Sequence, residues 1–136
     1  PAPARWGRYD TVLPDEVLIH NLEHGGITIQ YGPDVTQDVI MALIDWFIED
    51  SDAIVIAPHN GLGRVIALAA WTVDDLDQDV ESVYRSSEGN VLRCTGFDEA
   101  LFSDFRENYR GRTGWTCRCS GLRAPGRSTR RARRRV

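Results

Sequence analysis

Apolar and polar residues follow regular patterns along the first half of the chain. Residues 15–24 fit a short helix that begins after a proline and ends at a Gly-Gly pair. Residues 27–31 alternate as a half-buried strand does. Residues 36–49 carry apolar side chains at helical spacing. Residues 53–57 are apolar throughout, which is typical of an inner strand covered on both faces. The pattern therefore predicts a helix, a strand, a second helix and a second strand.

The second half of the chain predicts a further strand and a last helix. Residues 64–73 are predicted to return beside residues 53–57 in an antiparallel hairpin, because an Asn-Gly turn signal separates the two segments. Residues 74–81 carry five acids and predict a solvated linker or helix face. Residues 95–98 resemble a capping box. The helix that follows has an apolar side formed by Leu101, Phe102, Phe105 and Tyr109.

This order of elements predicts an α+β fold, in which helices pack on one face of a small antiparallel or mixed sheet. A chain of 136 residues is long enough to enclose one hydrophobic core. We expect residues 1–112 to form a single domain, with residues 1–14 as an extended N-terminal segment because prolines break any helix there. Residues 113–136 predict a disordered arginine-rich tail. The composition of this tail also fits an out-of-frame end of GC-rich coding DNA.

Charge divides the chain into two parts. The net charge is −4, but residues 1–117 carry −12 and residues 118–136 carry +8. The acidic part would repel a polyanion, so the sequence does not favour nucleic acid as a partner. No apolar run approaches the roughly 20 residues that a membrane helix needs.

The sequence offers no catalytic signature. The G-x-S-x-G motif, the phosphate-binding loop and the dinucleotide fingerprint are all absent. Cys94 has no residue that clearly serves as its base, and Cys117 and Cys119 form a C-x-C pair without the paired spacing of a zinc site. The sequence therefore favours a non-enzymatic domain.

One dense polar cluster lies in the first predicted helix. His20 and His24 are four residues apart, so their side chains point about 40° apart around the helix axis, and Glu23 lies on the same side. Histidines at this spacing can bind one copper or zinc ion through neutral ring nitrogens. His59 is the only other histidine of the chain. The cluster predicts a transition-metal site of His20, Glu23 and His24, with His59 as a further candidate ligand.

Two other interpretations of this cluster stay open. Residues 20–24 spell H-x-x-E-H, the signature of zinc hydrolases in which the glutamate acts as general base. That interpretation requires a long supporting helix and a distant third ligand. Alternatively, His20 and His24 make only hydrogen bonds on the helix face and help to hold together a structural or protein-interaction domain.

Several stretches of the sequence resemble one bacterial family. They include the WGRYD run at residues 6–10, the H-N-L-E-H-G-G core within residues 13–27, and shorter matches at residues 31–33, 56–58, 69–71 and 97–109. Over residues 4–112 the chain is similar to the family catalogued as domain of unknown function 3105. The resemblance implies a protein held outside the cytoplasmic membrane by an N-terminal segment, which would precede Pro1. It implies no activity, because the family is uncharacterised.

Overall fold

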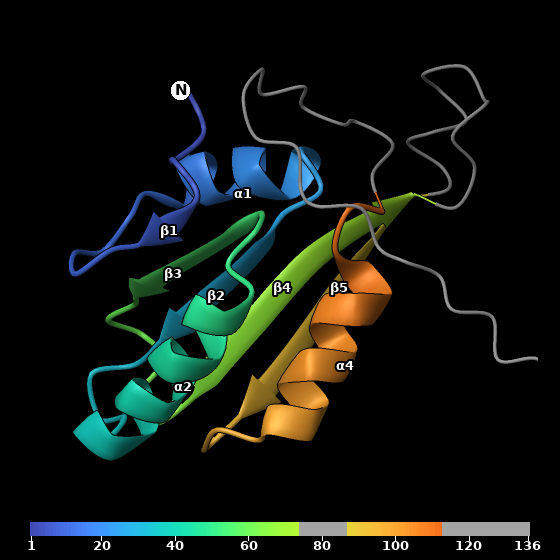
Figure 1. Cartoon of the computed structure of the whole chain (residues 1–136). Helices are drawn as coiled ribbons and strands as arrows, with labels where there is room; N and C mark the ends of the chain where they lie inside the picture. The colour runs from blue at the N-terminus through green and yellow to red at the C-terminus, as the bar shows by residue number, and fades with distance from the viewer. Residues whose placement is uncertain (74–86, 113–136) are drawn as a thin grey trace, which may run out of the picture.

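The structure is a computed structural model and describes residues 1–73 and 87–112. The predicted tail at residues 113–136 and the predicted acidic stretch at residues 74–81 therefore lie outside the described residues. In chain order the described elements are β1 (Gly7–Arg8), α1 (Asp15–Glu23), β2 (Ile27–Tyr31), α2 (Gln37–Glu49), β3 (Ile54–Pro58), β4 (Ile66–Val73), β5 (Ser87–Cys94) and α4 (Glu99–Tyr109) (Figure 1). None of the described helices has the length and apolar character needed to span a bilayer.

The described strands form one mixed sheet with the order β1-β3-β2-β4-β5. β3 runs parallel to both of its neighbours, β1 and β2. β4 runs antiparallel to β2 and to β5. The predicted α+β class with a small mixed sheet is confirmed, and the structure adds a two-residue strand, β1, inside the predicted extended N-terminal segment.

The predicted hairpin between β3 and β4 is wrong, because β2 lies between these two strands. The connection from β3 to β4 crosses the end of β2 instead. The backbone N–H of His59 donates to the Tyr31 carbonyl (2.9 Å), and the N–H of Gly32 donates to the Val65 carbonyl (3.0 Å). A side chain at Gly32 would overlap the backbone of Gly63, so glycine is required where the two segments pass.

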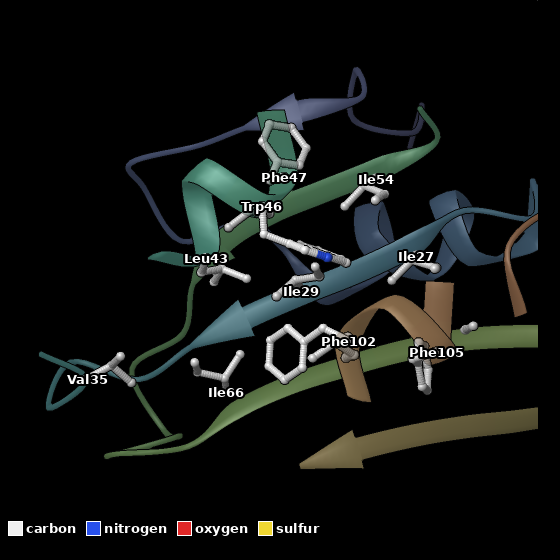
Figure 2. Packing of buried hydrophobic residues seen from close by; sticks show 13 residues of the cluster. Ile27, Ile29, Val35, Leu43, Trp46, Phe47, Ile54, Ile66, Phe102 and Phe105 are labelled. Carbon is white, nitrogen blue, oxygen red and sulfur yellow. The ribbon is translucent and has the colours of Figure 1, made fainter. Parts of the chain in front are cut away.

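Helices α2 and α4 lie on the same face of the sheet and enclose the hydrophobic core with it (Figures 1 and 2). Trp46 of α2 meets Phe102 of α4 edge to face, with ring centroids 5.9 Å apart. This geometry stabilises an aromatic pair by more than the burial of its surface area alone. The buried cluster consists of Ile27, Ile29, Val35, Leu43, Trp46, Phe47, Ile54, Ile56, Ile66, Leu68, Ala70, Phe102 and Phe105. Helix α1 lies apart from this pair and contacts β2 and β4.

A charged clamp joins the C-terminal ends of α2 and α4. Both terminal nitrogens of Arg110 donate to the Asp50 carboxylate, each at 2.7 Å. The Arg106 guanidinium donates to the Asp50 carbonyl (3.1 Å) and lies 4.2 Å from the centroid of the Trp46 ring. The hydrogen bonds from Arg110 hold the pKa of the Asp50 carboxyl below its ordinary value. The two helices are thus tied together at the edge of the core.

Candidate functional site

The two histidines of the candidate site lie at the C-terminal end of helix α1, His20 in its last turn and His24 as its C-cap residue. Carboxylates occupy its first turn, where the helix dipole favours negative charge. The helix ends at Glu23, and the N–H of His24 donates to the His20 carbonyl (3.2 Å). Gly25 follows with φ +80°, a left-handed conformation that glycine adopts without strain. The Gly-Gly pair therefore stops α1 directly after the histidines and turns the chain into β2.

The rings of His20 and His24 lie face to face. Their centroids are 4.8 Å apart and their planes differ by 20°. A ring nitrogen holds its lone pair in the plane of the ring, so the lone pairs of two nearly parallel rings do not converge. A zinc ion would need to lie about 2.0–2.1 Å from each nitrogen. One ring must therefore turn before both can ligate the same ion.

The two rings differ in their hydrogen bonding. Nδ1 of His20 lies 2.8 Å from the carbonyl oxygen of Pro1. Because a carbonyl oxygen only accepts, Nδ1 carries the hydrogen in this contact, and the lone pair of the neutral ring is on Nε2. Nδ1 of His24 is buried and has no hydrogen-bond partner among the described residues. The pair thus combines one oriented imidazole with one unsatisfied ring nitrogen.

The structure does not bring His59 to this pair. The backbone N–H of His59 bonds to Tyr31 at the carboxyl end of β2, whereas His24 stands just before its amino end, and a five-residue strand spans roughly 16 Å. Nδ1 of His59 instead accepts from the Gly61 N–H (3.0 Å). Glu23 is exposed on the last turn of α1. In the described ranges, no three His, Cys, Asp or Glu side chains group as metal ligands would.

The same stretch of α1 holds the N-terminal segment in place, a role that the sequence did not reveal. Asn21 is completely buried, its Oδ1 accepts from the Ala4 N–H (2.9 Å), and its Nδ2 donates to the Ala4 carbonyl (2.9 Å). The Trp6 ring lies against Gly26, where a side chain would overlap it. Together with the contact between His20 and Pro1, three residues of the H-N-L-E-H-G-G run each contact one residue of the N-terminal segment. One feature of the sequence could have indicated this role: asparagine is disfavoured inside a helix, and Asn21 lies inside a short one.

A family model with the description "Protein of unknown function (DUF3105)" matches residues 1–119. The chain belongs to this family. No curated protein and no solved structure matches the chain. The resemblance inferred from the H-N-L-E-H-G-G core is therefore confirmed.

Two kinds of chemistry find little support in this DUF3105 domain. Zinc hydrolysis through H-x-x-E-H would need a long helix and a third ligand, but α1 ends at Glu23 and the described part of the chain groups no third ligand with the histidines. Burial raises the pKa of the Cys94 thiol, and the nearby charge of Asp98 raises it further. A protonated thiol is a poor nucleophile. The histidine pair on α1 remains the strongest candidate site.

Proposed function

We propose that this domain binds a transition-metal ion, copper or zinc, through His20 and His24. The observation that carries the proposal is the pairing of two imidazoles on one helical turn, one of which has a buried ring nitrogen without a partner. A buried polar atom without a hydrogen bond is costly. Coordination would compensate this cost after a rotation of the His24 ring, and imidazole nitrogen is a good ligand for both metals.

The surroundings of the pair define the kind of site. The Pro1 carbonyl fixes the His20 tautomer that leaves Nε2 free for a metal, as backbone carbonyls do for many ligating histidines. Structural zinc sites use four protein ligands. Two imidazoles leave coordination positions open, which water, the Glu23 carboxylate or a small molecule would fill. The domain would accordingly hold an exchangeable ion.

Calorimetric titration tests this proposal. Zinc chloride and, separately, copper(II) chloride are added to wild type, His20→Ala, His24→Ala and His59→Ala, after each variant is shown to be folded by circular dichroism. We expect saturable heat in wild type and in His59→Ala, because His59 lies at the other end of β2. Both α1 variants should lose at least tenfold in affinity. Equal heats from wild type and from His20→Ala/His24→Ala would refute metal binding at the pair.

A second candidate function rests on the contacts that α1 makes with the N-terminal segment. The bond from His20 to Pro1 and the two bonds from Asn21 to Ala4 suit a domain in which this helix only maintains the fold of a structural or interaction module. Such a module would release no specific heat with either metal. In that case His20→Ala would lower the free energy of unfolding and leave the titration unchanged.

We further propose that the domain works outside the cytoplasmic membrane, attached through a segment that precedes residue 1. The resemblance of the H-N-L-E-H-G-G core, which implies such an anchored protein, supports this placement. The exposed Pro1 lies beside α1, so a preceding segment can leave the domain without crossing its core (Figure 1). Protease treatment of intact spheroplasts that express the complete gene product is the test. Protection of the domain from protease in intact spheroplasts would contradict an extracytoplasmic location.

A further inference from the structure

We propose that Asn21 and the N-terminal segment position the histidine pair, so that docking of residues 1–6 and binding of metal stabilise each other. This inference rests on the proposed function and adds its regulation: the affinity of the site depends on a segment that supplies no side-chain ligand. Asn21 acts here as a positioning residue, because it touches the segment and not the metal.

The N-terminal segment is held firmly at residues 4 and 6. Asn21 binds both polar groups of the Ala4 backbone at 2.9 Å, in the manner of a neighbouring strand, and its side chain is fully buried. Hydrogen bonds of a buried amide are costly to leave unmade. Trp6 fills the space that Gly26 leaves open. Residue 4 is therefore held by α1, and residue 6 by the turn that follows this helix.

The anchored segment also orients the His20 ring. The contact between Nδ1 of His20 and the Pro1 carbonyl (2.8 Å) is exposed to solvent, and an exposed hydrogen bond alone orients a side chain weakly. The anchoring of Ala4 holds the Pro1 carbonyl near the ring and reduces the entropy cost of that bond. The ring of His20 is thereby kept in one tautomer beside His24, with Nε2 free to bind a metal.

Docking of the segment and binding of metal are coupled thermodynamically. If docking of the segment increases metal affinity by some factor, bound metal must favour docking by the same factor. Loss of a group that orients a ligating histidine typically lowers metal affinity 10- to 100-fold. Under this coupling, the affinity for zinc and the protection of the Ala4 amide from hydrogen exchange change together.

The experiment measures both quantities in the full chain. Zinc affinity is determined by calorimetry for wild type, Asn21→Ala, Trp6→Ala and the control Asn108→Ala, which changes an exposed asparagine of α4. Trp6→Ala loosens the segment without opening a cavity in α1, so it replaces Asn21→Ala if that variant does not fold. We expect about a tenfold loss or more of zinc affinity in the two segment variants and none in Asn108→Ala.

Hydrogen exchange supplies the reciprocal readout. Zinc should slow exchange at the Ala4 amide in wild type but not in His24→Ala, which keeps the docked segment and loses a ligand. Folded Asn21→Ala or Trp6→Ala that binds zinc with wild-type affinity would overturn the inference while metal binding stands. If wild type itself binds no zinc through the pair, the proposed function fails and the inference fails with it.

Discussion

At the residue scale, Gly26 shows how close two segments distant in the chain approach each other. A Cβ built on Gly26 would overlap the Trp6 ring and lie 3.0 Å from the Ala53 carbonyl oxygen. The sequence predicted the Gly-Gly pair as the stop of α1, because glycine after a helix is a local signal. The requirement at Gly26 is set by a contact with a distant residue, so the local pattern could not reveal it.

We predict that Gly26→Ala destabilises the domain by about 1–3 kcal/mol. The added methyl group would force either the Trp6 ring or the backbone at Ala53 to move. Urea unfolding measures the change. Gly89→Ala is the matched control, because a Cβ at Gly89 meets nothing within 4 Å, and its effect should stay within roughly 0.5 kcal/mol. Equal effects of the two substitutions would show that Trp6 does not pack on Gly26 as described.

At the scale of elements, the sequence predicted most helices and strands because their signals are local. The predicted strand at residues 27–31 coincides with β2 (Ile27–Tyr31), and the predicted helix at residues 36–49 differs from α2 by one residue. β5 was not delimited, because the Ser-Glu-Gly-Asn start of this exposed strand shows no clear alternation. The order of the strands depends on long-range pairing. The Asn-Gly signal predicted a turn but not that β2 separates β3 from β4.

The clamp between α2 and α4 gives a pH-dependent prediction. In the folded state the pKa of Asp50 lies below its ordinary value of 3.8, mainly because Arg110 donates to the carboxylate. The clamp therefore contributes stability above pH 3.8, and this contribution is lost as the pH falls through the lowered folded-state pKa. Since the Asp50 side chain is 39% exposed, we expect Asp50→Asn to cost only about 1 kcal/mol at neutral pH.

Urea unfolding of wild type and Asp50→Asn between about pH 7 and about pH 2.5 tests this sign. The difference in the free energy of unfolding should be constant at higher pH and shrink at the acidic end. Asp104→Asn, on an exposed position of α4, serves as the control and should follow wild type throughout. A difference that grows on acidification would contradict the ion pair.

At the scale of the whole molecule, the candidate site was predictable only in part. The helical spacing of His20 and His24 was sufficient to place their rings side by side, as the structure does. The position of His59 relative to this pair depends on the end of β2 at which His59 lies. The arrangement of the strands in the sheet determines that position. The role of Asn21 depends on where the N-terminal segment folds back. Both are properties of the complete fold.

The two-residue turn at Gly25 and Gly26 also contacts residues close to the first and last described residues. Gly26 contacts Trp6, the Gly25 carbonyl accepts from the Gly111 N–H (2.8 Å), and the Arg112 carbonyl accepts from the Val73 N–H (2.8 Å). The exposed Asn60 lies at the opposite end of β2. Residues near both limits of the described part of the chain therefore meet at the same turn.

A circular permutant follows from this proximity. We predict that joining residue 112 to residue 1 by a linker of about six residues, and opening the chain after Asn60, yields a protein with the native circular dichroism spectrum and cooperative unfolding. Opening the chain within β2 should abolish folding, since that strand pairs on both sides. The fold of this domain would then not depend on the native position of the chain ends, and the loop after β3 would accept new ends.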